Sequence, residues 1–163
     1  MARVAIALGS NLGDRRAHLE AAIDLLMPHL RQALDSTFRD TAPVGVADQP
    51  PFLNGAIVGE AQLLPQALLK RLLAIEEQLG RTRPYWGAPR IVDLDLILYA
   101  DVILQEPGMQ IPHPRFRERA FVLEFQLGEF VLKLADDLAD LVADRRWVDI
   151  DVIIDAGQLA QQR

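Results

Sequence analysis

Residues 90–99, RIVDLDLILY, combine a run of large apolar side chains with two carboxylates. Large apolar and β-branched residues favour a buried strand, whereas aspartate is depleted from strands. Successive side chains of a strand point to opposite faces, so Asp93 and Asp95 should share one face while the leucines occupy the other. The leucines predicted to pack beneath helices are Leu94, Leu96 and Leu98. We therefore predict a sheet with one packed face and one open face that carries the two carboxylates.

Two helices and three further strands are predicted around this strand. Short apolar runs bounded by turn residues predict the strands, over 3–8, 36–40 and 52–61. Helices should follow Asp14, a suitable N-cap, and begin at Pro65, because proline is favoured in a first helical turn. Apolar residues one turn apart form a buried stripe on each helix: Leu19, Ile23, Leu26 and Leu30 on the first, and Leu68, Leu72, Ile75 and Leu79 on the second. Pro28 should kink or shorten the first helix, and Gly80 should end the second.

The order of these elements is β, α, β, β, α, β, which predicts an α+β ferredoxin-like fold with an antiparallel sheet and both helices on one face. The chain has 163 residues, half of them hydrophobic, and no cysteine. Its length suits one domain spanning 1–163, with C-terminal additions and an Asp-rich segment over 130–163 that the pattern does not assign. A disulfide framework and a thiolate metal site are excluded.

Charge is unevenly distributed along the chain, whose formal net charge is −6. Residues 136–155 hold seven aspartates against two arginines, whereas residues 81–90 hold three arginines and no acid. The overall acidity argues against a nucleic-acid surface, while the local cationic stretch suits a small polyanion. The apolar run at the N-terminus is too short for a signal peptide or a membrane span, so we expect a cytoplasmic protein without a membrane partner.

Asp93 and Asp95 should lie about 7 Å apart at the backbone, close enough for their carboxylates to converge on a hard cation such as Mg²⁺. The arginines just before them, Arg81, Arg83 and Arg90, match phosphate oxygens bidentately. Plain ion pairing between these acids and arginines is the alternative. Glu76 lies at the edge of a helical stripe, where it could orient an arginine or be simply exposed to solvent.

Aromatic and polar side chains could complete a pocket for a flat ligand. Phe52 and Phe121 could stack on a heterocycle whose edge Asn54 would read, although an ordinary core would use the same residues. His113, held between two prolines, could donate to a phosphate or transfer a proton, or have a structural role. The sequence contains neither a G-x-G-x-x-G nor a P-loop motif, which excludes the usual dinucleotide and P-loop readings.

Five blocks of the sequence together resemble the hydroxymethyl-dihydropterin pyrophosphokinase family. The blocks are ALGSNLGDR, TAPVGVADQPPFLNGAIV, IEEQLGRTR, WGAPRIVDLDLILY and IPHPRFRERAFVL, which fall within residues 4–129. The resemblance implies transfer of pyrophosphate from ATP to the hydroxymethyl group of a reduced pterin, with release of AMP, in tetrahydrofolate biosynthesis. It implies two Mg²⁺ ions held by Asp93 and Asp95, and these aspartates with Arg81 and Arg90 as the catalytic residues. We expect a monomer whose partners are ATP and the pterin.

The resemblance also implies residues for each substrate. Those on the ATP side are Glu76, Arg81, Arg83, Trp86, Arg90, His113 and Arg119. Those on the pterin side are Thr41, Ala42, Pro43, Val44, Gly45, Phe52, Asn54, Trp86, Asp93 and Phe121. The chain departs from the family pattern at Arg39, at Phe52 in place of a tyrosine, and in a shortened run between Arg83 and Trp86.

Two other functions remain compatible with the same residues. One is a ferredoxin-like paralogue that binds a small ligand without chemistry. The other is a metal-dependent nucleotidyltransferase, which would release pyrophosphate where a pyrophosphokinase releases AMP.

Overall fold

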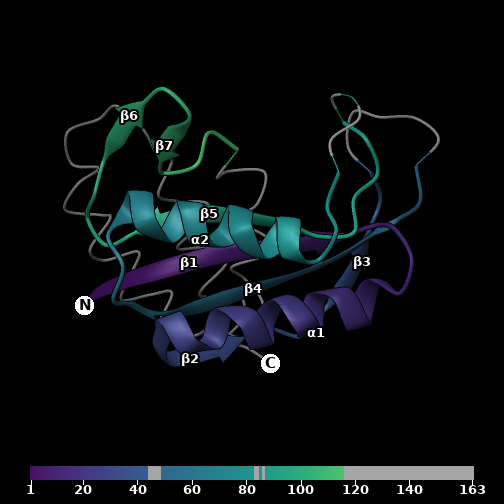
Figure 1. The fold of residues 1–163 in the computed structure, drawn as a ribbon, viewed down its shortest axis with the longest axis horizontal. Helices are drawn as coiled ribbons and strands as arrows, with labels where there is room; N and C mark the ends of the chain where they lie inside the picture. The colour runs from purple at the N-terminus through teal and green to yellow at the C-terminus, as the bar shows by residue number, and fades with distance from the viewer. Residues whose placement is uncertain (44–48, 83–84, 86, 116–163) are drawn as a thin grey trace, which may run out of the picture.

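The structure is a computed structural model that describes residues 1–43, 49–82, 85 and 87–115. The chain forms strand β1 (Ala2–Ser10), helix α1 (Arg15–Leu26), a short 3₁₀ turn (Met27–His29) and strands β2 (Leu30–Asp35) and β3 (Arg39–Thr41). These are followed by β4 (Phe52–Ala61), α2 (Pro65–Gln78), β5 (Asp93–Tyr99), and a hairpin of β6 (Leu104–Glu106) and β7 (Met109–Ile111) (Figure 1).

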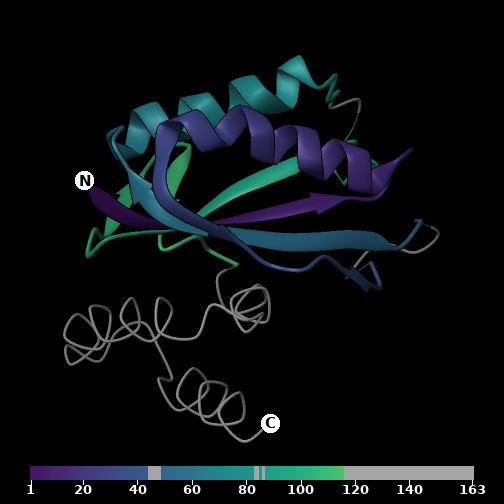
Figure 2. The same cartoon turned by 90° about the horizontal axis from the view of Figure 1, so that it is seen from below.

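The main strands of the described chain pair in the order β2-β4-β1-β5, and β3 pairs with the other part of β4. Every pairing is antiparallel. Figure 2 shows both helices lying on the same face of this sheet. The predicted α+β class, with an antiparallel sheet covered by two helices, is therefore confirmed, and the element order is that of a ferredoxin-like fold.

The core lies between the helices and the covered face of the sheet. The completely buried side chains include Ile6 and Leu8 of β1 and most of the predicted helical stripes. The buried stripe residues are Leu19, Leu26, Leu68, Leu72 and Ile75. Asp14 caps α1 as predicted, since its carboxylate accepts from the Ala17 amide at 3.1 Å.

The first helix and the second strand differ from the prediction. Helix α1 ends at Leu26, and Leu30 opens β2 instead of continuing the helical stripe. Proline has no amide hydrogen and cannot continue an α-helix, so the chain passes after Leu26 into the 3₁₀ turn that contains Pro28. The strand predicted over 36–40 is confirmed only for residues 39–40, which belong to β3. Its first residues are not in a strand, because β2 ends at Asp35 and Ser36 instead bonds Ala56 through both its amide and its hydroxyl.

Strand β5 begins at Asp93, not at residue 90, and contains an irregularity. Ala5 pairs with Leu98 but Ile6 pairs with Leu96, so one extra residue lies in β5 opposite this step. The alternation predicted for Leu94 and Leu96 is correct, but it breaks there, and Tyr99 joins the core cluster in place of Leu98.

The strands define two ends of the sheet. The site end is formed by Ser10, Phe52 and Asp93, and the far end by Ala2, Ala61 and Tyr99, as the strand registers show. The described residues that directly follow β3 and α2 also lie at the site end (Figure 1). Among the described residues, no helix is both long enough and apolar enough to cross a membrane.

Candidate active site

Gly9 lies at the centre of the site end, between the starts of β4 and β5. It pairs with Asn54 on one side and with Asp93 on the other. A Cβ atom on Gly9 would lie 2.9 Å from Oδ1 of Asn54 and 3.7 Å from the Phe52 ring. Glycine at this position therefore allows Asn54, Phe52 and Asp93 to gather over the same part of the sheet.

The Asp93 carboxylate is shared by two arginines. Its Oδ1 accepts from Arg81 at 2.7 Å, and its Oδ2 accepts from Arg90 at 2.8 Å. The alternation of the strand predicted that Asp93 lies on an open face, and this prediction is wrong, because Asp93 is only 7% exposed. The reason is that these arginines approach its carboxylate. The ion pairing that the sequence left as an alternative is thus present, and such charge-assisted bonds fix both guanidinium groups.

Glu76 holds Arg81 from the side of α2. Its Oε1 accepts from Arg81 and also from the Leu94 amide at 2.7 Å. Glu76 is 3% exposed, so the reading as a solvated helix residue is wrong and the reading as an orienting group is supported. Arg81 lies between the carboxylates of Glu76 and Asp93, and its position is therefore determined by both α2 and β5.

Asp95 and His113 face each other beside this cluster. Nε2 of His113 lies 3.7 Å from Oδ1 of Asp95. The His113 amide donates to the Ile97 carbonyl at 3.0 Å, which fixes the histidine along the outer edge of β5. Its Nδ1 accepts from the Arg115 amide at 3.1 Å. The neutral ring consequently carries its proton on Nε2, directed toward Asp95.

Asn54 and Phe52 form a polar and an aromatic surface next to Asp93. The Asn54 amide donates to the Thr41 hydroxyl at 2.6 Å, across the pairing of β3 with β4. The Arg90 guanidinium lies 5.6 Å from the centroid of the Phe52 ring, which is cation–π distance. Ala42 and Pro43 directly follow Thr41 in the chain. This arrangement can hold a flat, polar heterocycle beside an anion.

The predicted residues Val44, Gly45, Arg83, Trp86, Arg119 and Phe121 lie outside the described residues. Asn11 and Gln49, whose side-chain amides bind each other beside the site, were not predicted from the sequence. The available signal was an asparagine in a turn directly after a buried strand, a place where an unpaired amide would be costly.

Comparison with known proteins identifies the family of this chain. The model of the 7,8-dihydro-6-hydroxymethylpterin-pyrophosphokinase family matches residues 5–128. The chain belongs to this family. It is 38% identical over 149 residues to the 2-amino-4-hydroxy-6-hydroxymethyldihydropteridine pyrophosphokinase of Pseudomonas aeruginosa, covering 90% of this chain and 85% of that protein. The protein of the same description from Bacillus subtilis is 42% identical over 147 residues, covering 89% of this chain and 87% of its own.

Solved structures share the fold. The crystal structure of Plasmodium falciparum HPPK-DHPS wild type superimposes with a TM-score of 0.59 at 14% identity. The match covers 92% of this chain but 46% of that one, so the present chain spans about half the length of this neighbour. The pyrophosphokinase family membership thus rests on the sequence, and the structural neighbour supports the fold.

Proposed function

We propose that this chain transfers the β,γ-pyrophosphoryl group of ATP to the hydroxymethyl group of 6-hydroxymethyl-7,8-dihydropterin, releasing AMP, in tetrahydrofolate biosynthesis. The observation that carries the proposal is the juxtaposition, in a member of this family, of a cluster of acids and arginines with the surface formed by Asn54 and Phe52. One side suits an anionic donor and the other a flat acceptor.

Arg81 and Arg90 are the residues proposed to contact the phosphates. The Nε atoms of both are buried and have no hydrogen-bond partner among the residues that the structure describes. Phosphoryl transfer depends mainly on positioning and on neutralising the charge of the transferred group, which fixed guanidinium groups supply. Glu76 acts through Arg81 by limiting where its guanidinium can lie.

Asp93 and Asp95 are the residues proposed to hold two Mg²⁺ ions. No cluster of three or more His, Cys, Asp or Glu side chains forms a metal site within the described residues. Mg²⁺ commonly needs only one or two protein carboxylates and takes its other ligands from phosphates and water. An ionised carboxylate has about four lone-pair sites, so Asp93 can bind both arginines and still offer an oxygen to a cation. The ions would neutralise the negative charge of the phosphates.

The reaction forms one bond and breaks one. The hydroxymethyl oxygen of the pterin bonds to the β-phosphorus of ATP, while the bond between that phosphorus and the oxygen bridging to the α-phosphorus breaks. AMP leaves with the bridging oxygen, and the hydroxyl proton is released. Asn54 and Phe52 would hold the pterin beside the cluster of acids and arginines, and the Nε2 proton of His113, directed toward Asp95, would be available to a phosphate oxygen held at that carboxylate.

Residues outside the described ranges have roles in this proposal as well. Arg83 and Arg119 would contact ATP. The residues that would line the pterin site are Val44, Gly45 and Phe121, and Trp86 would help close it.

Among the described residues, Thr41, Ala42 and Pro43 would border the pterin largely through backbone groups. A monomeric, single-domain, cytoplasmic enzyme remains a prediction from the sequence.

The decisive experiment is product analysis after incubation with Mg²⁺, ATP and the hydroxymethyl pterin. AMP formed only in the presence of the pterin is the expected result. The variant Asp95→Asn should lower kcat by about a thousandfold, since it removes a carboxylate proposed to hold the Mg²⁺ that would neutralise charge on the transferred group. Asp101→Asn is the matched control, because Asp101 is exposed in the turn after β5.

Other products would overturn the proposal in distinct ways. Release of pyrophosphate would favour the nucleotidyltransferase, and pterin binding without turnover would favour the binding paralogue. Urea unfolding of Asp95→Asn should match that of the control. If Asp95→Asn instead loses activity only in proportion to its unfolded fraction, the carboxylate is structural.

A further inference from the structure

A buried side-chain amide directly follows β1 and makes contacts that the proposed chemistry does not use. Asn11 is 1% exposed. Its backbone amide donates to the Arg90 carbonyl at 3.1 Å, and its Oδ1 accepts from the Arg90 amide at 2.8 Å. Two hydrogen bonds therefore fix the backbone of Arg90, from a residue 79 positions earlier in the chain.

The other half of the same amide binds a second segment. Nδ2 of Asn11 donates to Oε1 of Gln49 at 3.0 Å and lies 3.4 Å from the Pro50 carbonyl. Nε2 of Gln49 in turn donates to the Gly87 carbonyl. Asn11 and Gln49 thus form a continuous link, named here the amide bridge, between the segment before β4 and the segment before β5.

We propose that the amide bridge of Asn11 and Gln49 positions Arg90 and couples the acceptor side of the site to the donor side. The inference rests on the proposed function, because it takes the pterin and ATP as the two ligands. Arg90 is the point of coupling, since its guanidinium binds Asp93 at 2.8 Å and covers the Phe52 ring at 5.6 Å. Neither amide is placed in contact with a substrate, so both are positioning residues.

The geometry explains how one ligand would affect the other. Gln49 is three residues before Phe52, and Gly87 is three residues before Arg90. A ligand that fixes the position of residues 49–52 also acts on residues 87–90 through the bridge, and the reverse holds, so the binding of one ligand changes the affinity for the other. Such coupling must be reciprocal between the two ligands.

The test measures binding, without turnover, for a pair of isosteric variants. Gln49→Glu keeps the oxygen that accepts from Asn11 but replaces the donor to Gly87 with an oxygen. Asn11→Asp keeps the acceptor for the Arg90 amide but removes the donor to Gln49. Gln66→Glu is the matched control, because Gln66 is exposed in the first turn of α2 and the charge change is the same.

The measured quantity is the coupling factor, the ratio of the Kd values of α,β-methylene-ATP without and with saturating pterin in the presence of Mg²⁺. In the wild-type chain and in Gln66→Glu we expect a factor of roughly 5 to 150, the usual range for coupled sites. In Gln49→Glu and Asn11→Asp it should fall to within about twofold of one, and the reciprocal factor for the pterin should fall equally.

A purely structural role would lower the free energy of unfolding and leave the coupling factor at its wild-type value, which would overturn the inference. A coupling factor of one in the wild-type chain would overturn it as well. Gln49 is only half-buried, so its variant keeps the test open if Asn11→Asp fails to fold. Failure of the proposed function would be recognised separately, because the wild-type chain would then form no AMP.

Discussion

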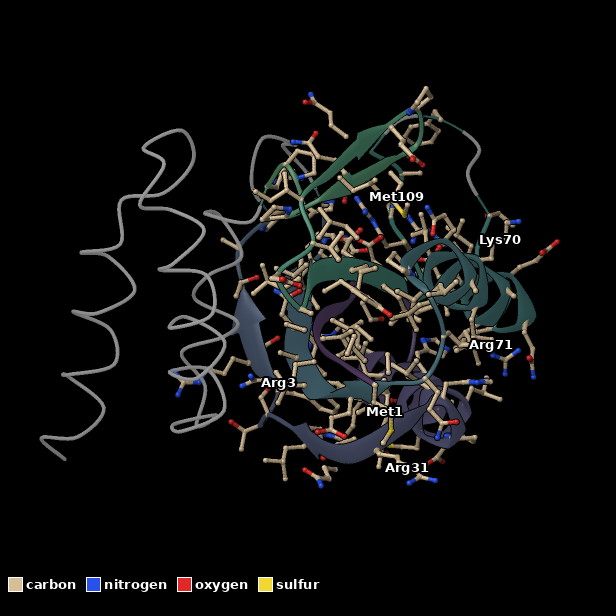
Figure 3. All side chains as sticks on the ribbon, turned by 90° about the vertical axis from the view of Figure 1, so that its left-hand side faces the viewer. Met1, Arg3, Arg31, Lys70, Arg71 and Met109 are labelled. Carbon is tan, nitrogen blue, oxygen red and sulfur yellow. The ribbon has the colours of Figure 1, made fainter. Side chains whose placement is uncertain are left out.

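The two ends of the sheet bury different kinds of groups. At the site end, the buried polar and charged residues include Asn11, Glu76 and Asp93. Figure 3 looks onto the far end, where Arg3, Arg31, Lys70 and Arg71 lie around the rim of the fold. A hydroxyl buried at the far end, that of Tyr99, donates to the Leu63 carbonyl at 2.8 Å.

This difference indicates which end stabilises the fold and which end serves the reaction. Burial of charges is costly even when they are paired, and replacing them with apolar groups is often neutral or stabilising. The carboxylates and arginines of the site end are therefore poor candidates for the main source of stability. Substitutions at the far end should change the free energy of unfolding, and substitutions at the site end should mainly change turnover.

The largest effect on stability is expected from Leu26→Ala, in the last turn of α1 toward the far end. Leu26 is completely buried, and removal of its side chain should leave a cavity in the core. The expected loss is about 2 to 5 kcal/mol in the free energy of unfolding, measured by urea denaturation. The kcat per folded molecule should not change. Leu73→Ala is the control, because Leu73 is 44% exposed on α2; a fall in kcat specific to Leu26→Ala would contradict the division between the ends.

A smaller effect, on turnover more than on the free energy of unfolding, is expected from Glu76→Gln at the site end. Glutamine keeps an acceptor for the Leu94 amide but removes the charge that holds Arg81, so the guanidinium should lose its fixed position. Small displacements of a positioning group cost about a hundredfold in rate, and we expect a 10- to 100-fold fall in kcat. Replacing a charge-assisted bond with a neutral one should lower the free energy of unfolding by no more than about 1 kcal/mol.

Glu77→Gln provides the matched control for this variant. Glu77 is the next residue of α2 but is exposed, so the same chemical change should leave kcat unaltered. If Glu76→Gln unfolds more easily yet turns over at the wild-type rate, Glu76 serves only the fold, and the site end is less specialised than the comparison suggests.

The parts of the fold that could be predicted are those encoded by local patterns. The bounds of β4 and the start of α2 follow from the run over 52–61 and from Pro65, and both are confirmed. The position of β2 could not be derived in this way, because Leu30 fits the helical spacing as well as a strand. The extra residue in β5 depends on pairing with β1, which no property of residues 90–99 reveals.

The candidate site was predictable where charges cluster in sequence. Asp93, Arg81 and Arg90 lie within thirteen positions of one another, and the structure brings them into direct contact. Glu76 and Asn11 were harder to place, because a glutamate at the edge of a helical stripe and an asparagine in a turn are usually solvated. Their hydrogen-bond partners are distant in the sequence and come close only when α2 and the turn after β1 pack next to β5.

The smallest effect is expected from Tyr99→Phe at the far end, where it should lower the free energy of unfolding by about 1 kcal/mol near neutral pH. This is the usual net value of one hydrogen bond, and the Leu63 carbonyl would lose its donor. Burial raises the pKa of Tyr99 above its ordinary value of 10.0. The unfolded chain therefore releases this proton at lower pH than the folded chain, and the stabilisation present below pH 10.0 is lost as the pH rises through the folded pKa.

Urea denaturation of the wild-type chain and of Tyr99→Phe from neutral pH upward tests this linkage. The difference between their free energies of unfolding should shrink above pH 10.0, because only the wild-type chain carries the buried hydroxyl. Tyr85 is 65% exposed and present in both proteins, so its ionisation contributes equally to each and cancels. A difference that stays constant, or grows, with alkaline pH would mean that the Tyr99 hydroxyl ionises in the folded chain at least as readily as in the unfolded one. Burial and the hydrogen bond to Leu63 would then not favour the protonated hydroxyl at the far end.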